Sequence, residues 1–229
     1  MKIAKFPSQA DFVAWLESEY NHNFLGWDFA HIRDRMVSTP LPWSYSSIVI
    51  QYMRSLQVQS LLDMGTGGGE FLATNFQPFP KHTVATEAYQ QNIPIAKSRL
   101  EPLGVKVVPI ESDSQIPLGD NEFDLIINQH EAFDAAEVFR ILKPKGFFIT
   151  KQVDGDNDRD LYRWFNLPYS TSEWHLNNVK CQLEDVGFHI KRALKSPMFT
   201  RLFDVGALVY YLKVVPWAIE GFQISDHIP

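Results

Sequence analysis

The chain has 229 residues, 45% hydrophobic and 21% charged, which suits one large α/β domain or a domain with a small cap. Its net charge is −6, and residues 61–150 hold 7 basic against 12 acidic side chains, which disfavours nucleic acid because phosphate binding needs basic residues. A lone Cys181 excludes an internal disulfide and a cysteine-rich zinc site. With no apolar leader and no membrane-spanning stretch, we expect a cytoplasmic protein.

Residues 1–57 are predicted to form an N-terminal helical cap. Ser8 is a plausible N-cap for a first helix, and a second helix is predicted over about 46–56. Between them, the two prolines of residues 39–45 indicate a stiff, extended segment. Because this aromatic-rich region precedes the first core strand, we expect it to act as a mobile lid over a ligand site. A permanently docked pair of helices is the alternative.

From Val58 onward, short apolar runs alternate with helical stretches. Strands are expected at 60–64, 82–87, 105–110, 123–128 and 147–153, and helices at 70–76, 89–103 and 134–142. Nearly continuous apolar strands of this kind favour a parallel sheet with helices on both faces. Residues 154–171 interrupt the alternation and are expected to form an insertion.

The C-terminal part is predicted to end the sheet differently. A helical stripe over 176–186 is followed by two apolar runs, 188–194 and 207–215, with no helical stretch between them. Two successive strands without a crossover helix pair antiparallel. The sequence therefore predicts residues 58–229 as one α/β domain with an antiparallel last strand.

A glycine-rich loop after the first strand is the strongest chemical signal. Asp63-Met-Gly-Thr-Gly-Gly-Gly69 links a buried strand to a helix, and glycines there allow a ligand to approach the backbone. A dinucleotide fingerprint would need a small residue at position 70, where this chain has Glu70, whose carboxylate would repel a pyrophosphate. Asp63 also suits a ligand with an ammonium group better than one with two phosphates. We predict cofactor contacts from this loop by Asp63, Gly65, Thr66, Gly67 and Gly69.

Polar residues at the ends of the next strands complete the predicted cofactor site. Glu87, followed by Ala88, can accept both hydroxyls of a ribose, and Ser112 and Asp113 lie where an adenine ring could be read. Asn128 ends the fourth of these strands, at the edge where α/β sheets bind ligands.

These motifs, in this order, resemble the class I, Rossmann-like superfamily of methyltransferases that use S-adenosylmethionine (SAM). The resemblance covers roughly residues 58–215 and includes 61–69, Glu87, Asp113, 121–127 and 141–147. Residues 26–29 and 204–213 also look like a generically named bacterial subgroup. The resemblance implies a seven-stranded sheet whose last strand is antiparallel, SAM as cofactor and S-adenosylhomocysteine as product.

The methyl acceptor is expected to be a small molecule. His130 and Glu131 follow the fourth strand and are candidates for a base beside the reacting methyl group, although His130 could equally be a loop histidine that bonds backbone. Trp43, Tyr45, Tyr162 and Trp164 are expected to contact the acceptor. The acidic run 154–160 lacks the glycine and glutamate of a calcium loop, so no metal is expected. The alternatives are an rRNA base methyltransferase and a non-catalytic SAM-binding protein.

Overall fold

The computed structural model describes residues 6–24, 29–169 and 174–227. The chain divides into two compact units: unit 1 comprises Met1–Leu41, Asp158–Thr171 and Ser196–Pro229, and unit 2 comprises Pro42–Asn157 and Ser172–Lys195. This division differs from the expected boundary at residue 57, because the second predicted helix belongs to unit 2 and the C-terminal residues return to unit 1. Residues 26–28 of the subgroup motif lie outside the described residues.

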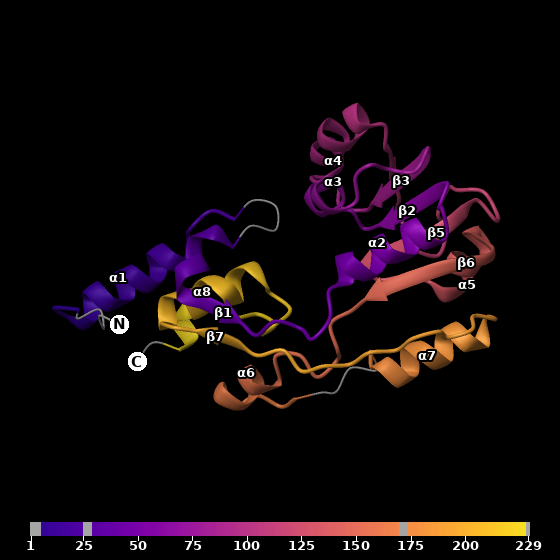
Figure 1. Ribbon diagram of the computed structural model, residues 1–229. Helices are drawn as coiled ribbons and strands as arrows, with labels where there is room; N and C mark the ends of the chain where they lie inside the picture. The colour runs from indigo at the N-terminus through magenta and orange to yellow at the C-terminus, as the bar shows by residue number, and fades with distance from the viewer. Residues whose placement is uncertain (1–5, 25–28, 170–173, 228–229) are drawn as a thin grey trace. The chain divides into compact units, whose positions relative to one another are not determined.

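Unit 2 is built on a sheet of five parallel strands in the order β4-β3-β2-β5-β6 (Figure 1). The strands are β2 (Ser60–Met64), β3 (His82–Glu87), β4 (Lys106–Pro109), β5 (Phe123–Gln129) and β6 (Leu142–Lys151). The register pairs Asp63 with Ala85 of β3 and with Ile127 of β5, so the carboxyl ends of these strands lie along one edge. The predicted α/β class and the parallel sheet are confirmed.

Helices cover both faces of this sheet because successive strand side chains point to opposite sides. One face, which includes Leu61 and Leu125, packs against α2 (Tyr45–Ser55), α3 (Glu70–Asn75) and α4 (Ile93–Leu100). The opposite face, which includes Leu62 and Ile126, packs against α5 (Ala135–Ile141), and α7 (Leu176–Asp185) lies beside α5. The short turn η2 (Glu101–Leu103) follows α4.

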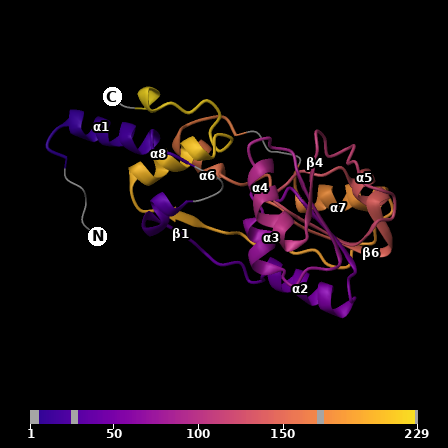
Figure 2. The same cartoon turned by 90° about the horizontal axis from the view of Figure 1, so that it is seen from above.

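Unit 1 is mainly helical and has a core of its own. Its elements are α1 (Gln9–Tyr20), η1 (Ala30–Arg35), β1 (Met36–Ser38), α6 (Arg159–Trp164), β7 (Thr200–Leu202), α8 (Val205–Val214) and η3 (Ile224–Asp226). Ser8 caps α1, as predicted, by accepting a hydrogen bond from the Asp11 amide at 3.2 Å. Helices α1 and α8 lie side by side (Figures 1 and 2), and β1 pairs antiparallel with β7.

The prediction of seven strands with an antiparallel last strand was wrong for the C-terminal part. Residues 188–194 have no regular secondary structure, and most of 207–215 lies in α8. Asp204 caps this helix, because its carboxylate accepts a hydrogen bond from the Ala207 amide at 2.8 Å. A short helix that is buried nearly all round shows the same continuous apolar run as a buried strand, so periodicity does not separate the two.

Strand β6 also begins earlier than predicted. Residues 143–146, which fall between the predicted helix 134–142 and the predicted strand 147–153, lie within the strand, which starts at Leu142, directly after α5. Its pairing with β5 contains an irregularity between Phe123 and Leu125, and this irregularity absorbs the extra residues.

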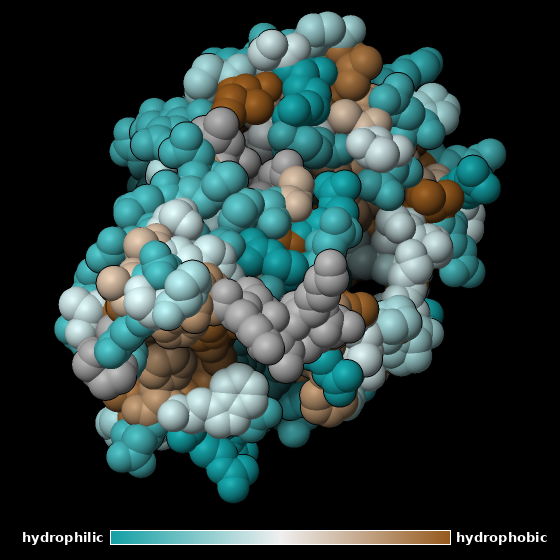
Figure 3. Space-filling view, turned by 90° about the vertical axis from the view of Figure 1, so that its left-hand side faces the viewer, coloured by the Kyte–Doolittle hydropathy of each residue, from teal (hydrophilic) through white to brown (hydrophobic). Residues whose placement is uncertain are grey.

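Most of the face drawn in Figure 3 is polar. Apolar side chains gather in one hollow of this face. Among the described residues, the most exposed large apolar side chains are Trp164, Phe199 and Trp217, at 71%, 67% and 63%. Within the same residues, no helix is long and apolar enough to cross a membrane.

Candidate active site

The glycine loop between β2 and α3 is held against its neighbours on two sides. Gly65 has a φ of +66°, and a Cβ placed there would lie 2.4 Å from Cγ of Glu131. Gly69, at φ +81°, would meet Leu100 of α4 at 2.7 Å. The Thr66 amide donates a hydrogen bond to the carbonyl of Thr86 at 2.9 Å, which ties the loop to β3. Only glycine allows both this backbone conformation and this close approach.

Acidic side chains interact with one another beside this loop. Asp63 and Glu87 are buried, and Glu131 and Asp113 are partly buried. Burial raises the pKa of Asp63 to about 7, and the carboxylate of Glu87 acts in the same direction. Burial also raises the pKa of Glu131 to about 7, reinforced by Asp113 and Glu87. None of these four groups forms an ion pair within the described residues, so this part of the site is acidic.

Asn128 lies at the centre of a polar network on the same edge of the sheet. Its Oδ1 atom accepts hydrogen bonds from Gln152 at 2.6 Å and from Thr150 at 2.9 Å. The side chain is fully buried, yet its Nδ2 atom has no hydrogen-bond partner among the described residues, and neither has Oε1 of Gln129. A buried polar atom without a partner costs free energy. Both atoms are therefore suited to bind a ligand.

His130 continues β5 in an unusual conformation. Its φ is +63°, and its amide donates a hydrogen bond to the carbonyl of Lys151 at 2.9 Å. Desolvation and the nearby Lys151 lower the pKa of His130 to about 4, so the ring is neutral at pH 7. Positive φ at a residue other than glycine is uncommon and clusters at functional sites.

The structure brings most of the predicted cofactor residues to one edge of the sheet. Asp63, the glycine loop, Glu87, Asn128 and Glu131 all lie at the carboxyl ends of β2, β3 and β5. One oxygen of Glu87 already accepts a hydrogen bond from the Tyr89 amide at 2.7 Å. Two predicted residues, Ala88 and Ser112, are exposed, and the Ser112 hydroxyl lies 2.9 Å from that of Ser114.

The four residues expected to contact the acceptor are divided between the units. Trp43 and Tyr45 belong to unit 2, and Tyr162 and Trp164 belong to unit 1. Tyr45 is buried, and its hydroxyl donates to the carbonyls of Asn128 at 3.0 Å and Ile149 at 3.3 Å, so it supports the site from beneath. In unit 1, Tyr162 packs edge-on against Tyr169 at 5.3 Å.

Sequence reasoning missed three residues that hold this edge together: Thr86, Thr150 and Gln152. Gln152 also donates to the carbonyl of Glu131 at 2.9 Å, which fixes the chain where it leaves β5. The signal for Thr150 and Gln152 was present, because polar residues end the apolar run of β6 as they end those of the other strands. Polar residues at the ends of four predicted strands are candidates for the site, and polar residues at the end of β6 are candidates for the same reason.

A second polar cluster of unit 2 involves the acidic run that follows β6. Asp154, Asp156 and His175 bring ligand atoms within 4.8 Å of one another. Asp154 is already paired, with His175 at 3.0 Å and with Lys195 at 2.7 Å. The contact with His175 connects the start of α7 to the acidic run, and the Lys195 ammonium group already neutralises the carboxylate of Asp154.

The middle of the chain matches a known family. Residues 62–150 match the family model described as "Methyltransferase domain", and the match includes the glycine loop, Glu87 and Asn128. This match confirms the resemblance to SAM-dependent methyltransferases seen in the sequence and the prediction of an enzyme.

Individual relatives are distant. A protein of Streptomyces fradiae, described as an uncharacterized 37.1 kDa protein in a transposon, is 26% identical over 133 residues. The match covers 54% of this chain and 39% of that protein, so the chain corresponds to well under half of its relative. Among solved structures, the YcgJ protein of Bacillus subtilis is 20% identical, with a TM-score of 0.51 over 62% of this chain and 67% of that one. The cyclase SpnF is 17% identical, with a TM-score of 0.50 over 64% and 57%. These likenesses establish the fold.

Proposed function

We propose that this chain binds SAM at the carboxyl edge of its sheet and transfers the methyl group to a small-molecule acceptor. The observation that carries the proposal is the unpaired acidic cluster beside the glycine loop. SAM carries a positive sulfur and an ammonium group, and buried carboxylates without a cation of their own favour such a ligand electrostatically. A pyrophosphate-bearing cofactor would be repelled by the same groups.

The residues present fit this cofactor part by part. Asp63 would hold the ammonium group, Glu87 would accept the ribose hydroxyls, and Asp113 would lie on the adenine side. The unpartnered Nδ2 of Asn128 offers one further donor to the ligand. When bound, SAM would supply an electrophilic methyl group, and alignment of the acceptor for in-line displacement accounts for much of the catalysis.

Of the two candidate bases, Glu131 is the better matched to neutral pH. A general base works best when its pKa lies near the working pH, and the pKa of Glu131 is about 7 whereas that of His130 is about 4. We therefore assign Glu131 to accept the acceptor's proton, where the acceptor carries one. His130 would then have a structural role, in which its positive φ sets the course of the chain after β5.

Calorimetric titration with S-adenosylhomocysteine, SAM and NADH tests the cofactor assignment. We expect both adenosyl compounds to bind and NADH not to bind. Transfer of a labelled methyl group from SAM to components of a metabolite extract then separates an enzyme from a non-catalytic SAM-binding protein. Ribosomal RNA as the only accepted substrate would contradict the small-molecule assignment.

The residue-level test is Glu87→Ala. Loss of charge-assisted hydrogen bonds to the ribose should weaken SAM binding by about 1.5–3 kcal/mol, measured by calorimetry. Glu101→Ala, at an exposed position in η2, is the matched control and should leave affinity unchanged. Equal affinity for SAM in both variants, with both folded, would show that Glu87 does not bind the ribose.

A further inference from the structure

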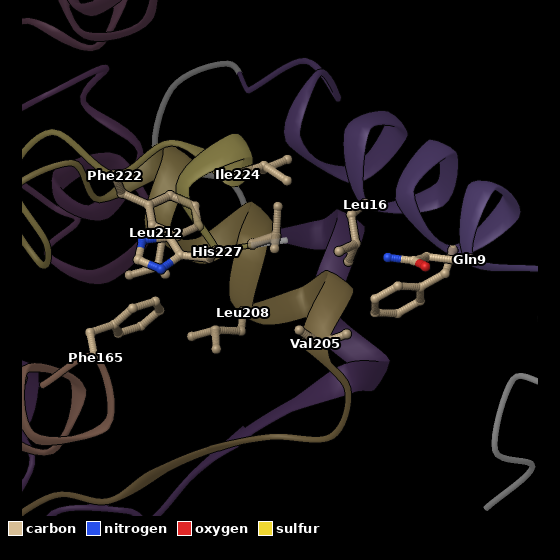
Figure 4. A pocket seen from close by; sticks show the side chains of 11 residues that line it. Gln9, Leu16, Phe165, Val205, Leu208, Leu212, Phe222, Ile224 and His227 are labelled. Atoms are coloured by element: carbon tan, nitrogen blue, oxygen red, sulfur yellow. The ribbon is translucent and has the colours of Figure 1, made fainter. Parts of the chain in front are cut away.

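Unit 1 contains a pocket of about 510 Å³ that the functional assignment above does not use. Its walls come from α1, from Phe165 after α6, from α8, and from the C-terminal segment around Ile224 (Figure 4). All of these residues belong to unit 1, so the pocket is a property of that unit alone. The volume falls in the range of roughly 300–1,000 Å³ that small-molecule sites occupy.

The pocket lies beside the contact between α1 and α8. A Cβ at Gly206 of α8 would lie 2.4 Å from the ring of Trp15 of α1, so the helices are in tight contact there. Next to this contact, a stripe of α8 lines the pocket together with α1, and it consists of Val205, Leu208, Val209 and Leu212. This spacing of i, i+3, i+4 and i+7 forms one continuous apolar face of a helix.

The lining is suited to an uncharged ring system. Apart from a histidine, none of the described lining residues is ionisable, and polar groups are confined to Gln9 and His227, at opposite ends of the pocket in Figure 4. The His227 ring stacks on Phe222 with centroids 5.4 Å apart and meets Phe165 edge-on at 4.8 Å. An apolar cavity of roughly 150 Å³ lined by Leu, Ile and Phe already accepts benzene. This pocket has the space for a larger aromatic molecule.

We propose that this pocket binds a small, uncharged aromatic molecule as a ligand of unit 1. Every lining residue belongs to unit 1, so the proposal does not depend on the function proposed for unit 2. Phe12 of α1 and Phe165 offer ring contacts to such a ligand. A second copy of the chain is the competing occupant.

Fluorescence titration with the neutral aromatic probe N-phenyl-1-naphthylamine tests occupation. We expect saturable enhancement with the wild-type chain, and at least about tenfold weaker binding by Leu208→Trp, because the added ring fills the space. Leu167→Trp is the matched control, since Leu167 is 40% exposed, lies in unit 1 and does not line the pocket. If Leu208→Trp does not fold, Val205→Phe, at a position 42% exposed, replaces it.

The outcomes separate this inference from the proposed function. Absent probe binding, or equal binding by the pocket variant and its control, would overturn the pocket while S-adenosylhomocysteine binding still supports the cofactor site. Probe binding by a chain that binds no adenosyl compound would support the pocket and contradict the cofactor site. A dimer that dissociates in Leu208→Trp, seen by sedimentation velocity, would assign the pocket to a second copy.

Discussion

The two units treat their buried carboxylates in opposite ways. In unit 1, Glu19 is paired with Arg35 at 2.7 Å and with His31 at 2.6 Å, and in unit 2 neither Asp63 nor Glu131 forms an ion pair within the described residues. Burial by itself would raise the pKa of Glu19, but the hydrogen bonds from Arg35 and His31 outweigh it and hold the pKa below its usual value. The pKa values of Asp63 and Glu131 rise to about 7. The contrast separates a carboxylate that is paired with cations of its own unit from two carboxylates that have no such partner within the described residues.

The largest expected effect is on the paired carboxylate. Glu19→Ala should lower the free energy of unfolding by about 2–4 kcal/mol, because Arg35 loses its main partner and keeps only Asp204, at 3.3 Å, and part of its solvent. Asp63→Asn is the counterpart in unit 2 and should change stability by less than about 1 kcal/mol while cofactor binding is lost. Urea unfolding and calorimetry measure the two quantities. Equal destabilisation by both variants would break the comparison.

The second effect concerns the loop that carries the site. Gly65→Ala should destabilise unit 2 by more than about 2 kcal/mol and abolish cofactor binding, because the new Cβ would meet both the positive φ and the side chain of Glu131. Gly104→Ala is a matched control, since Gly104 has a φ of +84° but no atom within 4 Å of the added Cβ. It should cost only about 1–2 kcal/mol of backbone strain, measured by denaturant unfolding. A similar loss in both variants would mean that the Glu131 contact is unimportant.

The third effect is a difference in pH dependence between the units. Because the folded-state pKa of Glu131 is raised, its contribution to stability is full at low pH and is lost as pH rises from about 4.5 to about 7. Glu19 has a lowered pKa, so its contribution is lost as pH falls. Glu131→Gln should flatten the loss between pH 5 and 7 by roughly 1–2 kcal/mol, with the side chain's partial solvation taken into account. Thermal unfolding across this range checks the slope, and an unchanged slope in the variant would contradict the assignment.

Cofactor binding sharpens the same contrast. A cationic ligand should favour the ionised forms of Asp63 and Glu131, so SAM binding near pH 7 should release protons and tighten as the pH rises through 7. Calorimetry in two buffers of different ionisation enthalpy counts those protons.

The smallest effect is at Tyr45, a buried group that is satisfied like Glu19 but lies beneath the ligand site. Tyr45→Phe removes the hydrogen bonds to the carbonyls of Asn128 and Ile149 and should cost about 0.5–1.5 kcal/mol of stability. Phe147→Leu, at a position of β6 that lies in the same core, gives a purely apolar comparison. A large loss of cofactor affinity in Tyr45→Phe would show that the Tyr45 hydroxyl contacts the cofactor directly.

The sequence by itself determined unit 2 as far as its local signals reached. Apolar runs ending in Asp63, Glu87 and Asn128 define parallel strands with polar carboxyl ends, and such ends meet at one edge in any sheet of this kind. For this reason the sequence alone places Asp63, Glu87 and Asn128 at one edge of the sheet. Thr150 and Gln152 also lie at the end of an apolar strand, so the same pattern indicates them, but they were not predicted as site residues.

Only the tertiary structure decided unit 1 and the paired or unpaired state of the acidic groups. Whether the run after Asp204 forms a helix or a strand depends on whether it is buried against α1 or inside a sheet, and both environments select the same apolar residues. The unit itself is assembled from three separate segments of the chain, which no local pattern connects. Likewise, Glu19 and Asp63 are both buried acidic residues, and nothing local in the sequence tells which of them has a cation as partner. Their environments differ because the fold brings the Arg35 cation to Glu19, whereas it brings the Glu87 carboxylate and the glycine loop to Asp63.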